Sequence, residues 1–99
     1  MADHAHVVNV SRYRPASGKR EQLMSAMKRM AQRAAEAKGC FGAQACVSDR
    51  DQQDLIAVSR WESSDALHTF SNTAASAAEQ DQLKGLLAGP AQRENLRPI

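Results

Sequence analysis

Aromatic side chains are scarce in this sequence, which has one Trp, one Tyr and two Phe among 99 residues. Although 42% of the residues are hydrophobic, a core with so few rings has to be built largely from Ala, Val, Leu and Met. A chain of this length has room for one domain and buries roughly two-thirds of its unfolded surface. We therefore expect residues 1–99 to form a single domain with a thin core.

Strong net charge and long apolar runs are lacking as well. The formal net charge is only +2, and the basic residues are spread along one predicted helix, so nothing indicates a nucleic-acid partner. No run approaches the ~20 apolar residues of a membrane span, and Met1–His4 is followed by no apolar signal-peptide core. We expect a cytoplasmic protein without a membrane partner.

The sequence has two cysteines, Cys40 and Cys46. On one strand their Cα atoms would be separated by roughly 20 Å, which is far beyond the reach of a disulfide. Their spacing matches no zinc motif either. We expect two reduced thiols that pack as small hydrophobic groups, and no metal site.

The centre of the chain is a strand that leads directly into a helix. The run Leu55–Val58 is apolar in both parities, which is typical of a strand covered on both faces, and it ends on the only tryptophan, Trp61. Ser63 or Ser64 can cap the following helix, and Asp65 lies in its first turn, where the helix dipole favours an anion. Since the chain has few elements, one face of such a strand is expected to be covered by its own helices and the other by a partner subunit.

The segment before this junction predicts a strand, a helix and a second strand. The alternation of residues 6–13 predicts a strand. One of its faces mixes apolar and polar side chains, as a cavity wall does, and consists of Val7, Asn9, Ser11 and Tyr13. Residues 19–38 have helical periodicity, with Ser17 as the expected cap and Gly39 as the left-handed stop. The apolar stripe of this helix consists of Leu23, Ala26, Met27, Met30, Ala31 and Ala34. Residues 40–48 form the next strand, and the polar stretch 49–54 predicts a hairpin to the central strand.

The sequence after the junction helix predicts a second helical segment, followed by a short C-terminal stretch. The helix starts at Thr73, with Ser76 as an alternative start, and runs through an Ala-rich stretch to Leu86 and Leu87. Gly89 and Pro90 break it. We expect the remaining residues to form a short edge strand, or an extended tail that lies across a partner.

The order strand, helix, strand, strand, helix predicts a ferredoxin-like α+β fold with a short or missing last strand. The sequence Trp61-Glu62-Ser63, followed by a helix with Ala66, Leu67 and Phe70, resembles the antibiotic biosynthesis monooxygenase family. Residues 83–90 are similar to the corresponding region of its anthrone-oxidising members. This resemblance implies a dimeric α/β barrel, in which two copies pack their sheets face to face.

The resemblance also implies a chemistry. Some members of the family oxidise phenolic substrates such as anthrones with dioxygen and use no metal or organic cofactor, and Trp61 occupies the family's tryptophan position. Ala57 and Leu67 stand where the anthrone oxygenases carry Asn and Tyr. Haem-degrading members resemble this chain at Asn9, but their haem-binding Trp and His correspond to Phe70 and Gln80. We expect no cofactor.

The candidate site follows from these residues. Trp61 and Asn9 are the predicted catalytic residues, and Tyr13, Ser11, His68 and Phe70 are predicted to bind substrate. Trp61 either donates its indole N–H to a substrate or serves only as packing. His68 is either a general base or a solvated surface residue.

Two functions remain open at this point. The first is a cofactor-independent monooxygenase that acts on a small aromatic or quinol-type substrate. The second is a non-catalytic ligand-binding or stress-related homodimer whose cavity holds a small hydrophobic molecule, and the fold does not decide between the two.

Overall fold

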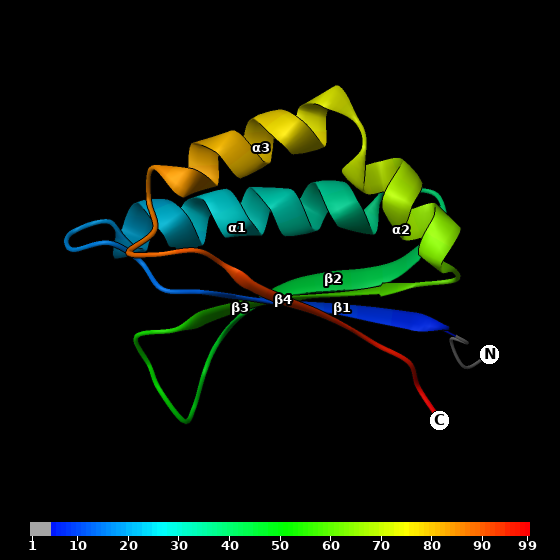
Figure 1. Cartoon of the computed structure of the whole chain (residues 1–99), viewed down its shortest axis with the longest axis horizontal. Coiled ribbons are helices and arrows are strands. Elements are labelled where there is room, and N and C mark those ends of the chain that lie inside the picture. Colours follow the sequence, from blue (N-terminus) through cyan, green and yellow to red (C-terminus); the bar gives the residue numbers. More distant parts are fainter. Residues whose placement is uncertain (1–4) are drawn as a thin grey trace.

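The computed structural model describes residues 5–99, so Met1–His4, on which part of the localisation prediction depends, lies outside the described residues. Four strands and three helices follow one another in the order expected from the sequence (Figure 1). They are β1 (Val7–Tyr13), α1 (Arg20–Ala35), β2 (Cys40–Val47), β3 (Leu55–Trp61), α2 (Ser64–Ser71), α3 (Ala74–Lys84) and β4 (Gln92–Leu96). The ferredoxin-like α+β prediction is confirmed.

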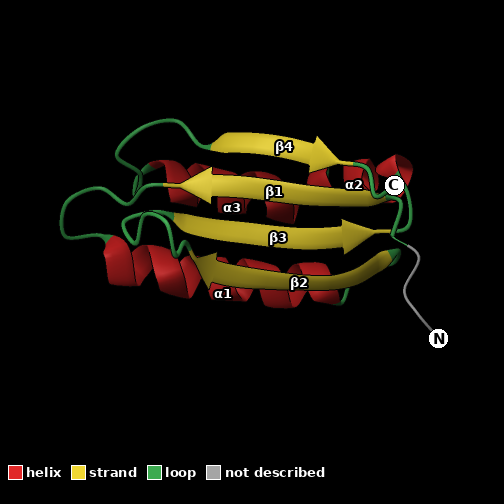
Figure 2. Cartoon of the chain, turned by 90° about the horizontal axis from the view of Figure 1, so that it is seen from below, coloured by secondary structure: helices red, strands yellow, loops and turns green. Residues whose placement is uncertain are grey.

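The strands form one antiparallel sheet in the order β2-β3-β1-β4. All three helices lie on one face of it, and the opposite face carries no helix (Figures 1 and 2). The cross-strand pairs Val7–Trp61 and Tyr13–Leu55 set the register, and these four side chains are buried beneath the helices. The predicted division of β1 into two faces is therefore correct, with Asn9 and Ser11 on the helix side.

The other face of the sheet is apolar at its centre. Val10 pairs with Val58, Arg12 pairs with Ile56, and the apolar residues of this face are only half-buried or exposed. We call this surface the outer face, and it contains Val8, Val10, Ile56, Val58 and Leu96. It is where the sequence predicts a partner subunit.

Helix α1 differs from its prediction at both ends. Its N-cap is Lys19 without a side-chain hydrogen bond, so the prediction of Ser17 as the cap was wrong, because Gly18 turns the chain at a φ of +75° between Ser17 and the helix. The helix ends at Ala35 instead of Lys38, where tighter bonds from Glu36 and Ala37 replace the α-helical pattern. Gly39 has the predicted positive φ, +83°.

The caps of the two later helices are confirmed. Ser63 Oγ accepts a hydrogen bond from the Ala66 N–H at 3.1 Å, and Thr73 Oγ1 accepts one from the Ser76 N–H at 3.2 Å. Helix α3 ends at Lys84, before the predicted Leu86 and Leu87. The chain leaves the helix there because Leu87 forms a β-bridge with Pro15.

The short edge strand predicted after Pro90 is β4, which pairs antiparallel with β1. It begins at Gln92, and all five of its residues are exposed. Within residues 5–99, no helix combines the length and apolar character needed to cross a membrane.

Two buried clusters hold the helices on the sheet. One, at the Tyr13 end, is formed by Tyr13, Leu23, Ala26, Met27, Leu55 and Leu83, and the other, at the Trp61 end, by Val7, Ala34, Trp61 and Leu67. Tyr13 lies in the first cluster and Trp61 in the second, with Phe70 packed against it, whereas Phe41 is exposed. Cys40 and Cys46 both lie on β2 as free thiols.

An ion-pair cluster connects the β2–β3 loop to β1 and the residue after it. Arg12 Nη1 donates to Asp54 at 2.6 Å, and Arg14 Nε donates to the same carboxylate at 2.9 Å. The hydrogen bond from Arg14, followed by that from Arg12, lowers the pKa of Asp54 below its usual value. The sequence interpretation of residues 49–54 as a polar turn did not include this buried carboxylate.

Candidate functional site

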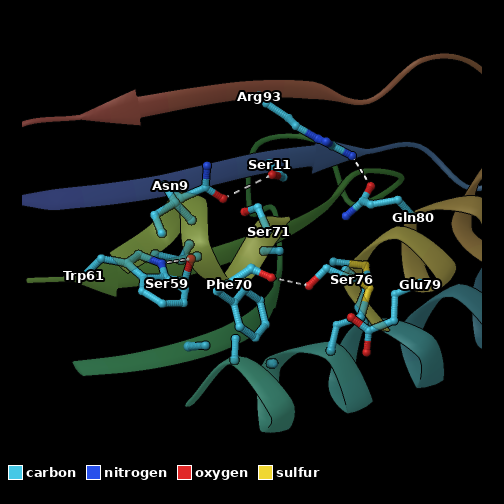
Figure 3. A pocket seen from close by; sticks show the side chains of 18 of the residues that line it. Asn9, Ser11, Ser59, Trp61, Phe70, Ser71, Ser76, Glu79, Gln80 and Arg93 are labelled. Carbon is cyan, nitrogen blue, oxygen red and sulfur yellow. Dashed lines mark hydrogen bonds between the residues drawn. The ribbon is translucent and has the colours of Figure 1, made fainter. Parts of the chain in front are cut away.

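A pocket of about 370 Å³ lies between the helices and the sheet, and its lining includes residues of β1, β3, β4 and all three helices (Figure 3). Its volume is within the range of small-molecule sites, which starts at roughly 300 Å³. All six predicted site residues line it: Asn9, Ser11, Tyr13, Trp61, His68 and Phe70. The sequence pattern therefore identified residues that the fold brings to one cavity.

One end of the pocket is aromatic. Trp61 is only 1% exposed, and its ring centroid is 5.2 Å from that of Phe70, with the planes tilted by 43°. The Arg33 guanidinium carbon lies 4.4 Å from the centre of the Phe70 ring, close enough for a cation–π contact. A flat aromatic ligand would find rings to pack against at this end.

Four uncharged polar residues of the sheet lie together in the lining, and we call them the polar floor: Asn9, Ser11, Ser59 and Asn95. Asn9 is the central member, because it pairs with Ser59 on one side and Asn95 on the other. Its Nδ2 donates to Asn95 Oδ1 at 2.7 Å, and its Oδ1 accepts a long bond from Ser11 Oγ at 3.5 Å. The floor has no carboxylate, so it can present donors to an anionic oxygen without charge repulsion.

The indole N–H of Trp61 is engaged within the chain. Its Nε1 donates to Ser59 Oγ at 2.8 Å (Figure 3). Buried indole nitrogens usually find such a partner. The ring of Trp61 therefore lines the pocket while its polar atom contacts Ser59.

Charged groups are gathered at the α3 end of the pocket. Arg33 makes two bonds to the Glu79 carboxylate, at 2.6 and 2.9 Å, and a further one to Ser76 Oγ at 2.6 Å. The hydrogen bond to Glu79 raises the pKa of Arg33. On the β4 side, Arg93 donates to the Gln80 side chain. These bonds connect α3 to α1 and to β4, and so form part of the pocket wall.

The remaining predicted residues occupy different depths. Tyr13 is 2% exposed and belongs to the buried cluster at its end of the pocket, whereas His68 is exposed on α2. His68 is thus placed where a ligand or solvent can reach it. Met27 and Met30 of the predicted core stripe also line the cavity.

Several polar lining residues were not singled out from the sequence. Ser59 shares its strand parity with Trp61, and that signal was sufficient to place it on the same face. Arg93 and Asn95 lie on β4, where no long strand pattern exists, and Gln80 and Glu79 are placed by the docking of α3. Sequence periodicity gives no information on that docking.

Ala57 and Leu67 line the same pocket with apolar side chains. Within residues 5–99, no three His, Cys, Asp or Glu side chains are gathered so that they could hold a metal ion.

Comparison with known proteins gives a family and a fold. Residues 6–82 match the family model of antibiotic biosynthesis monooxygenases. The solved structure of Rv0793 from Mycobacterium tuberculosis has a TM-score of 0.86 at 22% identity, with 94% of each chain covered. A candidate antibiotic biosynthesis monooxygenase from Caulobacter crescentus has a TM-score of 0.85 at 19% identity, covering 96% of this chain and 91% of that one. One from Deinococcus radiodurans reaches 0.86 at 15% identity, covering 94% and 92%. No curated protein matches the sequence.

Proposed function

Because this chain belongs to the antibiotic biosynthesis monooxygenase family, we propose that it is a cofactor-independent monooxygenase that oxidises a small aromatic or quinol-type substrate with dioxygen. The observation that carries the proposal is the convergence of Trp61 and Phe70 with the polar floor on one cavity. An aromatic end holds the ring, and a floor of donors stabilises the oxygen anion that makes such a ring electron-rich.

The proposed reaction balances without an added reductant. A methylene group of an anthrone becomes a carbonyl, one atom of dioxygen enters the product, and the other leaves as water with the two hydrogens. The substrate supplies all four electrons. The chain's part is to bind the ionised substrate, to orient it against the Trp61 and Phe70 rings, and to exclude water from the site.

In this proposal Asn9 and Trp61 are the catalytic residues, and Ser11, Tyr13, His68 and Phe70 bind substrate. Asn9 contributes an amide donor, Ser11 supports it from the neighbouring position, and Phe70 packs against the ring. His68 is exposed on α2 and lines the pocket, and its proposed role is to accept the substrate proton and pass it to solvent.

We further propose that a second copy covers the outer face. The chain exposes 6607 Å², whereas a folded monomer of this mass typically exposes about 5500 Å². The excess of about 1100 Å² is more than the roughly 800 Å² that each partner buries in a standard interface. Val10→Glu would place a carboxylate at the centre of the apolar face twice in a symmetric dimer, and we expect sedimentation equilibrium to show a monomer. A dimer that persists in Val10→Glu would refute this interface.

We also propose a cytoplasmic location, since the two cysteines are unbridged and the cytoplasm keeps thiols reduced. Cell fractionation checks this directly, and recovery of the protein from an oxidising compartment would contradict it.

Oxygen uptake tests the proposed reaction. The purified protein is given a panel of anthrones and hydroquinones without added metal or flavin, beside Asn9→Ala and Trp61→Phe. We expect turnover in the unmodified protein and at least a tenfold loss in Asn9→Ala. Uptake no faster than in buffer with every compound would refute the oxygenase.

The second candidate is a non-catalytic dimer that binds a small hydrophobic ligand. It is favoured by Ala57 and Leu67, which contribute only apolar groups to the pocket. It predicts that aromatic compounds quench the fluorescence of Trp61 but are recovered unchanged. Consumption of both oxygen and compound would exclude it.

A further inference from the structure

The side chain of Trp61 is poorly placed to donate a hydrogen bond to a ligand. It is 1% exposed, and its only N–H donates to Ser59 Oγ at 2.8 Å. An indole has no second donor. To bond a ligand directly, Trp61 would have to abandon Ser59 and turn within a packed cluster that includes Val7, Ala34 and Leu67.

Ser59 accepts the hydrogen bond of Trp61 and presents its hydroxyl group to the pocket. A serine hydroxyl has one donor and two acceptor positions, and the bond from Trp61 occupies one acceptor. Among the described residues, none accepts a hydrogen bond from Ser59, and Ser59 lines the cavity. Accepting one bond also strengthens the bond that a hydroxyl donates, because the groups polarise one another.

Asn9 supplies a second donor beside Ser59. The two residues are directly opposite in the β1–β3 register, so their Cβ atoms are about 4.5–5.5 Å apart. The Asn9 amide uses one N–H for Asn95 Oδ1, which leaves its second N–H for another acceptor. Two donors from adjacent strands can thus reach one oxygen atom.

The acidic residues of the pocket lining do not oppose an anion at this point. Glu79 is held by two bonds from Arg33 on α1. Glu94 pairs with Val10, which places it in the register of the outer face. The polar floor around Ser59 and Asn9 is therefore a donor-rich surface next to the rings of Trp61 and Phe70.

We propose that Ser59, polarised by the Trp61 indole N–H, donates the hydrogen bond that binds the phenolate or carbonyl oxygen of an aromatic ligand, with Asn9 as the second donor. Trp61 then contacts the ligand through its ring, while its N–H acts by positioning Ser59. The ligand class rests on the proposed function, but the donor arrangement rests only on the contacts described here.

The test uses 1,8-dihydroxyanthraquinone as the probe. Its visible absorbance reports whether the bound phenol is ionised, and Trp61, the only tryptophan, reports binding by fluorescence quenching. We expect Ser59→Ala to weaken binding of the ionised probe about tenfold, which corresponds to a rise of about one unit in the pKa of the bound phenol. Ser59→Thr keeps the hydroxyl and is expected to restore both values.

Trp61→Phe, followed by absorbance, separates the two possible donors. Since Ser59 keeps its hydroxyl in this variant, we expect a smaller rise in the phenol pKa than in Ser59→Ala. Ser64→Ala, at an exposed serine outside the pocket, is the matched control. An unchanged emission maximum of Trp61 in Ser59→Thr would show that the strand is still packed.

The proposal is overturned if Ser59→Ala binds the ionised probe as the unmodified protein does, or if Trp61→Phe loses more than Ser59→Ala. Oxygen uptake distinguishes it from the proposed function. Ser59-dependent ionisation of the probe without oxygen uptake from any anthrone would refute the oxygenase and leave this inference intact. Oxygen uptake that is unaffected by Ser59→Ala would refute this inference and leave the proposed oxygenase intact.

Discussion

Replacing Gly39 by alanine perturbs the junction on which the pocket depends. Gly39 has a φ of +83°, and an added Cβ would lie 2.7 Å from Ala66 Cβ and 2.9 Å from Glu62 Oε2. Its carbonyl also accepts the Glu62 N–H at 2.8 Å, directly after Trp61. The substitution therefore forces the start of α2 away from the end of β3.

The cost has two separable parts. A left-handed backbone destabilises a non-glycine residue by roughly 1–2 kcal/mol. The lower conformational entropy of alanine in the unfolded chain offsets about 0.4–1 kcal/mol of this loss. Overpacking of a fixed contact adds about 1–3 kcal/mol. Gly18 has a similar φ of +75° with nothing within 4 Å of an added Cβ, so Gly18→Ala measures the first part alone. We expect a loss of about 1 kcal/mol for Gly18→Ala and about 2–4 kcal/mol for Gly39→Ala.

Urea denaturation followed by the fluorescence of Trp61 measures both losses, since this tryptophan is buried in the native state. The variants have to be compared at one protein concentration, because association would shift every midpoint. Equal losses in Gly18→Ala and Gly39→Ala would refute the close contact with Ala66 and Glu62.

Two further predictions concern the ion pairs. The hydrogen bond from Arg14 helps to lower the pKa of Asp54 in the folded protein. The ionised Asp54 therefore stabilises the fold above the pKa of an unfolded aspartate, and this stabilisation is lost as the pH falls through the lower pKa of the folded state. We expect Asp54→Asn to have a lower urea midpoint at pH 7 and a smaller difference at pH 3, and a constant difference would contradict this. The side chains of Arg33 and Glu79 are half-buried, at 31% and 23% exposed, so we expect Arg33→Met to lower the free energy of unfolding by about 1–2 kcal/mol. Amide exchange should accelerate in α3, and exchange that accelerates only outside α3 would show that this pair does not hold the helix.

The arrangement of the sheet and its helices could be predicted because local patterns set it. Alternation in residues 6–13 fixes which side chains face the helices, and a one-residue shift would have moved Asn9 and Ser11 to the outer face. Ser63 and Thr73 cap their helices through bonds within three residues, so the sequence is sufficient to find them. The helix ends were less predictable, because Leu87 leaves α3 for a distant bridge with Pro15.

The candidate site could likewise be predicted only in part. Trp61, Asn9 and Ser11 follow from strand parity. The bond between Trp61 and Ser59 depends on side-chain torsion angles, which no pattern records. The approach of Arg33 to Glu79 joins residues 46 positions apart, and the pair is formed only when α3 docks on α1.

The strand order has a consequence for folding. The β2–β3 hairpin is local, but the polar floor is assembled from β1, β3 and β4, and its Asn9–Asn95 bond joins residues 86 positions apart. Such distant pairings form slowly, because the entropy of closing the loop is lost before the contact is gained. We expect the hairpin to form early and the floor last. A ligand in this pocket therefore binds only the completed sheet, and its binding energy stabilises the pairings of longest range.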